Sequence, residues 1–163
     1  MEQTMKQMNQ IITPAELLKH WQGHRDLTRR VIEAFPEEEY FNFSIGGMRS
    51  FAAMTMELLG IAVPALREIV GGNVTEVNKQ AEPGNKKENI LQLWDTATEE
   101  INTLWSQIPV ERFHDSIMLF GKYEGTVWST IFYAIDNEIH HRGQGYVYLR
   151  ALGIEPPFFW ERK

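Results

Sequence analysis

The segment from Asp136 to Gln144 gathers two adjacent histidines, two carboxylates and two amides within a few helical turns of otherwise apolar sequence. Polar groups of this kind cost free energy to bury unless a partner satisfies them. Imidazole, carboxylate and amide groups can all donate electron pairs to a metal ion. We therefore expect this segment to contribute to a metal site, and a bound divalent ion is the leading explanation for its composition.

The spacing within the segment separates two candidate pairs. Asn137 and His141 are four residues apart and lie one above the other on the same face of a helix. Two further polar residues continue that face, Gln144 and Tyr148. Asp136 and His140 form a second pair with the same spacing, rotated by one residue. Both pairs cannot point at the same ion, so we expect only one of them to supply direct ligands.

A second candidate ligand is Glu57, which is the only charged residue between Arg49 and Arg67. Its neighbours one helical turn away are apolar or small: Ala53, Met54, Gly60 and Ile61. An unpaired buried carboxylate costs several kcal/mol. Glu57 therefore lies either at the exposed edge of its helix or inside the fold with a partner.

Composition limits the chemistry that is available. The chain has 163 residues, which is typical of one domain, and we treat residues 1–163 as a single unit. Hydrophobic residues make up 43% and charged residues 23%, as in ordinary globular proteins. Cysteine is absent, so the chain has no disulfide, thiolate ligand or cysteine nucleophile. Any metal must be held by histidine, carboxylate, amide or water.

The net charge of −6 argues against nucleic-acid binding, because phosphate contacts need a basic patch and the basic residues here are scattered. Residues 1–10 are polar and lack the apolar core of a signal peptide. No apolar run is long enough to span a bilayer. We therefore expect a cytoplasmic protein that binds neither nucleic acid nor membrane.

Apolar periodicity predicts four long helices. The first follows the capping box Thr13-Pro14-Ala15-Glu16 and ends at Pro36. The others are expected at about 47–70, 88–107 and 126–152, with Pro64 disturbing the second. Residues 37–39 are expected to be an acidic link, residues 73–87 an exposed loop, and residues 110–125 a connection with a short extended pair.

These elements predict an all-α fold, a four-helix bundle, whose interior is a usual place for metal sites. Four tryptophans are expected in its core: Trp21, Trp94, Trp105 and Trp128. Pro156 and Pro157 end the last helix, and the aromatic residues 158–160 are expected to pack across the bundle.

The sequence NEIHHRGQGYVYLRALG, residues 137–153, with Ile154-Glu155-Pro156-Pro157 after it, resembles the C-terminal motif of the DinB family. This family, with the DinB/YfiT-like fold, is distinct from the DNA polymerase that shares its name. The resemblance implies a four-helix bundle with up-down-down-up connectivity. It also implies a divalent metal held by three histidines, one from the second helix and two from a four-residue spacing on the fourth.

Carried onto this chain, the resemblance places the metal ligands at Glu57, Asn137 and His141. His141 precedes Arg142-Gly143-Gln144, as the family's last histidine does. Residues 48–57 resemble the segment that leads to the family's first ligand, which puts Glu57 where histidine is usual. Asn137 stands where the family has its second histidine. This donor set would suit Zn, Ni or Mn.

The resemblance also implies an activity, because several family members are transferases that use low-molecular-weight thiols such as bacillithiol or mycothiol. The expected function is thus a metal-dependent thiol S-transferase or a hydrolase acting on a small molecule. Gln144 or Tyr148 would orient the substrate. Arg142 would support the site or pair with Glu138 on the surface, and His140 is an alternative ligand.

Plainer alternatives stand beside these expectations. In one alternative, Glu57 and His141 form a hydrogen-bonded pair without a metal ion, and Asn137 satisfies a backbone group or bridges to Glu57. The spacing of His20 and His24 is most simply that of surface or edge histidines. The alternative function is a non-catalytic, stress-associated bundle for binding or dimerisation. The resemblance also makes a homodimer possible, because family members often pair through helix faces. The aromatic tail is either one surface for such pairing or packs within its own chain.

Overall fold

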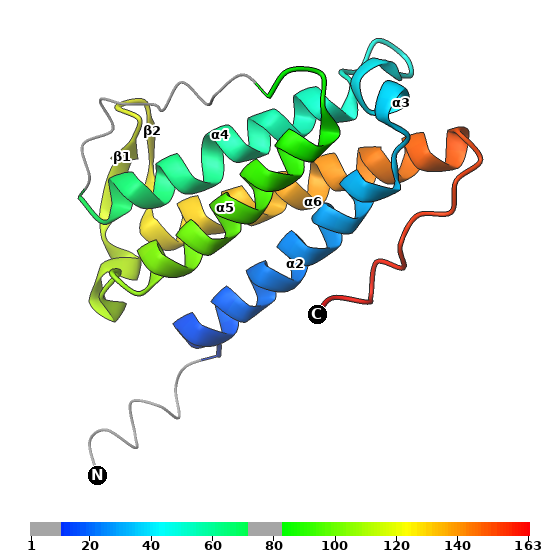
Figure 1. Ribbon diagram of the computed structural model, residues 1–163. Helices are drawn as coiled ribbons and strands as arrows, with labels where there is room; N and C mark the ends of the chain where they lie inside the picture. Colours follow the sequence, from blue (N-terminus) through cyan, green and yellow to red (C-terminus); the bar gives the residue numbers. More distant parts are fainter. Residues whose placement is uncertain (1–10, 72–82) are drawn as a thin grey trace.

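The computed structural model describes residues 11–71 and 83–163. Within these residues there are five α-helices, one 3-10 helix and two strands. They follow the order α2 (Pro14–Ala34), α3 (Glu37–Asn42), α4 (Phe51–Ile69), α5 (Lys87–Trp105), η1 (Val110–His114), β1 (Ser116–Leu119), β2 (Tyr123–Thr126) and α6 (Val127–Ala151). Figure 1 shows the four long helices side by side, with the hairpin at one end and α3 at the other. Most of the expected loop at 73–87 lies outside the described residues.

Helix α2 begins at the predicted capping box. The Glu16 carboxylate accepts a hydrogen bond from the backbone N–H of Thr13 at 2.8 Å, and the Thr13 hydroxyl accepts one from the N–H of Glu16 at 3.2 Å. These two bonds satisfy N–H groups that the first helical turn otherwise leaves without partners. The helix ends before Pro36, as predicted.

Two expectations about the next segment are wrong. Residues 37–42 form the short helix α3 and not an acidic link. The three glutamates in its first turn stabilise the helix because their negative charges interact with the positive end of the helix dipole. Helix α4 begins at Phe51 and not near Gly47. Gly46 and Gly47 adopt φ values of 59° and 76°, so they form a turn, and Ser50 caps the helix by accepting from the N–H of Ala53 at 3.3 Å.

The all-α expectation is right for most of the described chain and incomplete for residues 116–126. Strands β1 and β2 pair antiparallel, with Ser116 opposite Thr126 and Leu119 opposite Tyr123. This is the short extended pair that the sequence predicted in this connection. The hairpin is joined to α4 through the Glu68 carboxylate, which accepts from the N–H of Phe120 at 3.0 Å.

Polar residues divide the core at mid-length. One buried apolar cluster, near the hairpin, contains Trp21, Trp105 and Ile131, and the other, near α3, contains Phe51, Trp94 and Tyr148, to name three of each. Between them along α2 and α6 lie five buried polar side chains: His24, Arg25, Thr28, Glu138 and Arg142. The helix that carries the candidate site therefore crosses a polar layer where a bundle is usually apolar.

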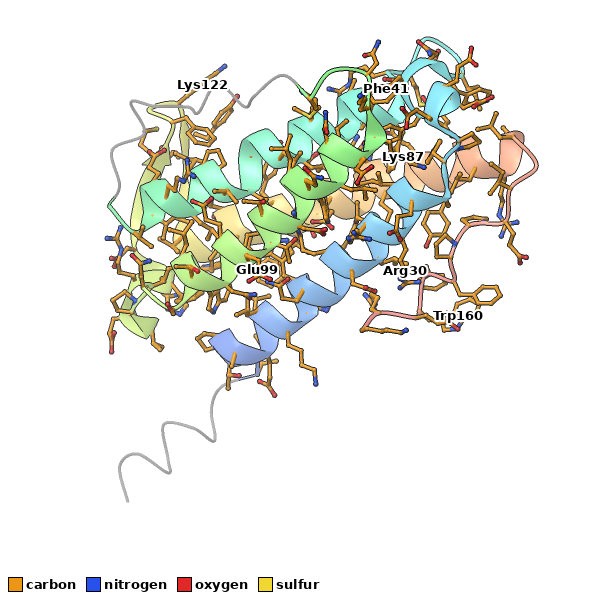
Figure 2. The ribbon with its side chains drawn as sticks, viewed as in Figure 1. Arg30, Phe41, Lys87, Glu99, Lys122 and Trp160 are labelled. Carbon is orange, nitrogen blue, oxygen red and sulfur yellow. The ribbon has the colours of Figure 1, made fainter. Side chains whose placement is uncertain are left out.

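Two predictions about aromatic packing are wrong. Trp128 is 43% exposed, whereas the other three tryptophans expected in the core are buried. Phe158, Phe159 and Trp160 are also exposed, and Phe158 stacks on Trp160. The C-terminal segment returns alongside α2, where the Arg30 guanidinium donates to the backbone oxygen of Glu161; Figure 2 shows Arg30 and Trp160 along the same edge.

Among the described helices, none combines the length and the apolar character that crossing a membrane requires.

Candidate functional site

Helices α4 and α6 bring the three predicted ligands together. The Nε2 atom of His141 lies 3.1 Å from the Oε1 atom of Glu57, and the amide nitrogen of Asn137 lies 3.4 Å from the same oxygen. Close helix packing makes this possible. A Cβ atom at Gly145 would lie only 2.6 Å from the Phe51 ring, so glycine lets the two helices approach.

The backbone before α4 is also tied to α6. The hydroxyl of Tyr148 donates to the backbone oxygen of Arg49 at 2.8 Å. Tyr148 is fully buried, so it fixes the start of α4 and does not face an open site. The expectation that Tyr148 orients a substrate has no support in this placement.

Gln144 sets the proton position on His141. Its side-chain oxygen lies 2.9 Å from Nδ1 of His141, and its amide group donates to the Met48 sulfur at 3.7 Å. A carbonyl oxygen only accepts hydrogen bonds, so Nδ1 must carry a proton. In a neutral ring, Nε2 then presents a lone pair to the Glu57 carboxylate. Two acceptors would face each other at 3.1 Å, which requires a proton or a cation between them.

Arg49 completes the surroundings of Glu57. Its guanidinium lies 2.5 Å from Oε2, so the two carboxylate oxygens are divided between Arg49 on one side and the Asn137–His141 pair on the other. Partial burial by itself raises the pKa of Glu57, but its contacts with Arg49, His141 and Asn137 outweigh burial and hold that pKa below its ordinary value. Glu57 is therefore ionised at neutral pH.

The observed separations are compatible with a shared metal ion. Ligand atoms about 2.1 Å from one ion lie roughly 3.0–3.4 Å apart at coordination angles between about 90° and 110°. The two separations to Glu57 Oε1, 3.1 and 3.4 Å, fall at the two ends of this range. Glu57 and His141 are strong donors, and rotation of the Asn137 amide would present its oxygen in place of its nitrogen. The residues present thus fit a divalent ion, with two strong ligands and one weak one.

The fit to a divalent ion is limited by the third donor, which is an amide and not a histidine. In the described part of the chain, no group of three or more histidine, cysteine, aspartate or glutamate side chains could hold a metal. The third donor here is an amide, and amides bind divalent ions more weakly than imidazole does. We therefore expect weaker binding than three histidines would give.

Two of the other predicted residues lie apart from the site. Asp136 is exposed, and the hydrogen bonds and ion pairs of Glu57 and His141 do not include it. His140 is exposed too, and its ring packs edge-on against that of His141 with centroids 5.0 Å apart. The rotation of this pair by one residue turns it toward solvent, as helix geometry requires.

Arg142 belongs to a separate buried cluster. It does pair with Glu138, but the expectation that this pair lies on the surface is wrong, because both side chains are buried. Glu138 accepts from the Thr28 hydroxyl at 2.6 Å. Its carboxylate lies 3.7 Å from Arg25 and 4.0 Å from Arg142. The exposed fractions of Glu138 and Arg25 are 2% and 1%. One carboxylate here neutralises part of the charge of two buried guanidinium groups.

His24 is buried in the same layer, and the expectation of a surface or edge histidine is wrong. Its Nδ1 lies 2.9 Å from a guanidinium nitrogen of Arg142, and its Nε2 lies 3.2 Å from Nε2 of His20. Burial lowers the pKa of His24 to about 3, and the neighbouring charges of Arg142, His20 and Arg162 act in the same direction. His24 is therefore neutral at physiological pH and accepts from Arg142.

Sequence reasoning missed Arg49 and the α2 members of the buried cluster. Arg49 precedes α4 and shares no helical face with Glu57, so spacing gives no sign of their contact. Arg25 and Thr28 were missed because an isolated arginine or threonine on an amphipathic helix is normally predicted to lie on the surface. A usable signal was Glu138, whose helix neighbours Ala134 and Ile135 are apolar.

Comparisons with known proteins agree with the motif on α6. The family model described as the DinB family matches residues 1–162. YjoA of Bacillus subtilis strain 168, described as an uncharacterized protein, is 26% identical over 162 residues, covering 97% of this chain and 99% of YjoA.

Two solved structures have a similar fold. The crystal structure of the DinB-like protein YjoA from Bacillus subtilis aligns with a TM-score of 0.72 and 24% identity, covering 90% of this chain and 99% of that one. A DinB-like protein from Bacillus cereus ATCC 10987 aligns with a TM-score of 0.71 and 16% identity, covering 88% and 95%. Because the family model matches almost the whole length of the sequence, this chain belongs to the DinB family.

Proposed function

We propose that this chain binds one divalent metal ion through Glu57, His141 and Asn137 and uses it to act on a small molecule. The observation that carries the proposal is the arrangement around Nε2 of His141. Gln144 fixes the proton on Nδ1, so the Nε2 lone pair and the ionised Glu57 carboxylate converge at 3.1 Å. A cation between them would satisfy both. The proposal assumes that the four long helices form the up-down-down-up four-helix bundle of the DinB/YfiT-like fold.

The residues of the site would divide the work. Glu57 and His141 hold the ion, and Asn137 adds a weak oxygen donor. Gln144 keeps the imidazole in the tautomer that leaves Nε2 free, which is the usual role of a partner behind a metal-bound histidine. Arg49 holds the second oxygen of Glu57 and so limits how that carboxylate turns.

The reaction class that we propose is transfer of a low-molecular-weight thiol to an electrophile, or hydrolysis of a small molecule. A bound divalent ion would supply Lewis acidity and lower the pKa of a bound thiol or water. The chain has no cysteine, so a thiol nucleophile would come from a second substrate. Glu57 is 31% exposed at its side chain, which leaves one side of the site open to such molecules.

A second candidate is a metal-free bundle with a binding or dimerisation role in a stress response. The observation in its favour is the Arg49 guanidinium, 2.5 Å from Glu57, which already neutralises the carboxylate. In this reading a proton, in place of a metal ion, lies between Nε2 of His141 and the Glu57 carboxylate. Its function would not depend on a divalent ion.

Metal titration separates the two candidates. We expect untagged protein to bind about one equivalent of Zn, Ni or Mn in calorimetric titration, and Glu57→Gln and His141→Ala each to abolish binding. His114→Ala is the matched control, because His114 is exposed and remote in sequence from the site. Wild-type protein that binds no metal, or that binds it equally well after both site substitutions, would rule out the proposed ion and favour the metal-free candidate.

A further inference from the structure

Arg49 has more hydrogen-bond donors than its contact with Glu57 uses. A guanidinium group carries five N–H donors in a planar fork. Nη1 of Arg49 lies 2.5 Å from the Glu57 carboxylate, whereas Nε and Nη2 form no hydrogen bond within residues 11–71 and 83–163. The Arg49 side chain is 50% exposed. Its remaining donors are therefore accessible to a molecule that arrives from solvent.

Arg29 shows how a surface guanidinium is filled when the chain supplies the partners. Its Nε and Nη2 atoms donate to the two carboxylate oxygens of Asp95 at 2.6 and 3.0 Å, and its Nη1 atom donates to Glu33. This two-pronged contact is the geometry in which arginine binds a carboxylate most strongly. In Arg49 the same two nitrogens have no hydrogen-bond partner in the described chain. They can accept a carboxylate from another molecule.

The backbone holds Arg49 beside the candidate metal site. The buried Tyr148 hydroxyl donates to the backbone oxygen of Arg49 at 2.8 Å, which fixes the base of the arginine side chain against α6. Ala53, one helical turn before Glu57 on α4, is exposed and ends at its methyl group. A long side chain at this position would cover the approach to Glu57, and alanine leaves it open. One molecule can therefore reach Arg49 and Glu57 together.

A divalent ion would also give this site an excess of positive charge. Arg49 and Glu57 neutralise each other, and the other side chains of the site are uncharged in the proposed state: Asn137, His141 and Gln144. The double charge of the ion then has no counter-charge among these residues. A bound cation of this kind is the largest local charge and favours a ligand that is itself negative.

We propose that Arg49 determines the substrate class of this site. Its Nε and Nη2 atoms bind the carboxylate of a small organic acid while another atom of the same molecule binds the metal ion. Nη1 keeps its contact with Glu57, so one guanidinium connects the metal ligand to the substrate. This inference rests on the metal site proposed above, and it adds that neutral molecules of the same shape bind weakly.

Distances limit the acid to a short one. The ion would lie about 2.1 Å from one oxygen of Glu57, and the two oxygens of a carboxylate are about 2.2 Å apart. Since Nη1 of Arg49 is 2.5 Å from the second oxygen, that nitrogen lies within about 7 Å of the ion. A metal–sulfur bond is about 2.3 Å long, so a thiol separated from a carboxylate by about two carbon atoms can reach both. The probe 3-mercaptopropionate has this length.

The experiment compares two probes that differ only in charge, 3-mercaptopropionate and 3-mercaptopropionamide. Each is titrated into protein saturated with cobalt(II), whose thiolate charge-transfer absorption reports sulfur binding to the ion. We expect the wild-type chain to bind the carboxylate about tenfold more tightly than the amide, because a two-pronged charged hydrogen bond forms at an accessible side chain. Saturation with cobalt removes any difference in metal affinity between variants.

Three variants assign the preference to Arg49. Arg49→Gln should weaken binding of the carboxylate about tenfold and leave binding of the amide unchanged. Arg49→Lys keeps the charge without the planar fork, so it should retain only part of the preference. Arg67→Gln is the matched control, because Arg67 pairs with Glu100 and lies about 15 Å beyond Glu57 on the same helix. It should keep the wild-type preference.

Two results would overturn this inference and leave the metal site standing: equal binding of the two probes by the cobalt-loaded wild type, or a preference that survives Arg49→Gln. If the wild-type chain takes up no cobalt, the proposed function and this inference fail together. The cobalt absorption before any thiol is added distinguishes these failures, and neither measurement depends on enzymatic activity.

Discussion

Replacement of Glu138 by glutamine should be among the most destabilising single substitutions in the described chain. Glutamine has nearly the same shape and can still accept from the Thr28 hydroxyl, which now donates to Glu138 at 2.6 Å. The substitution therefore removes the negative charge and little else. It leaves Arg25 and Arg142, which are 1% and 5% exposed, buried without a carboxylate.

The expected magnitude follows from this burial. Removing one member of a buried ion pair costs about 3–5 kcal/mol, because the remaining charge stays desolvated. Since glutamine keeps one hydrogen bond, we expect Glu138→Gln to lower the free energy of unfolding by about 3 kcal/mol. With a urea m-value of about 1–3 kcal/mol/M, the midpoint of unfolding falls by roughly 1–3 M.

Urea denaturation followed by circular dichroism measures this change. Asp136→Asn is the control, since Asp136 is exposed on the same helix and its substitution should change stability by less than about 0.5 kcal/mol. In the double variant with Arg25→Met, the two effects should be strongly non-additive, with a coupling above about 1 kcal/mol. A loss below about 1 kcal/mol for Glu138→Gln would refute the view that these buried charges depend on one another.

Three further predictions concern the site and its surroundings. Arg49→Gln should tighten metal binding about tenfold in calorimetric titration, because it removes a cation that competes for Glu57; unchanged or weaker binding would contradict this. His24 should make stability pH-dependent, because its pKa is about 3 in the folded state and 6.5 in the unfolded chain. Its contribution to the free energy of unfolding is therefore full above pH 6.5 and is lost as the pH falls toward 3. The loss is at most about 1.4 kcal/mol per pH unit. Urea unfolding at pH 7.5 and 4.5 should show a smaller loss in His24→Asn, and equal losses would contradict the argument. Gly145→Val should cost several kcal/mol in the same assay through its clash with Phe51, and a cost below 1 kcal/mol would show that α4 and α6 can separate freely.

The helices could be predicted because local chemistry determines them. Thr13 and Glu16 form the capping box that their spacing requires. The start of α4 was predicted four residues early because apolar periodicity does not show that Gly46 and Gly47 adopt positive φ. Trp128 was misplaced because hydrophobicity alone does not tell a core residue from one that faces outward.

The site was predictable in its strong donors and not in its partners. Glu57 stands out in sequence because its neighbours are apolar or small, and His141 stands out because it lies in the polar segment 136–144. The structure brings the two side chains within 3.1 Å. The contact between Arg49 and Glu57 depends on how the turn before α4 folds, which no local pattern encodes. The pairing of Glu138 with Arg25 joins α6 to α2 across more than a hundred residues of chain and appears only in three dimensions.

Histidine side-chain NMR tests the central claim most directly, because it reads the nitrogen that should bind the ion. The chain has five histidines, so the other four serve as internal controls. On titration with Zn, we expect the Nε2 resonance of His141 to shift and saturate at one equivalent while its Nδ1 stays protonated, held by Gln144. If His141 does not respond, or if the closely spaced His20 and His24 respond in its place, the metal site is not where the geometry of α4 and α6 puts it.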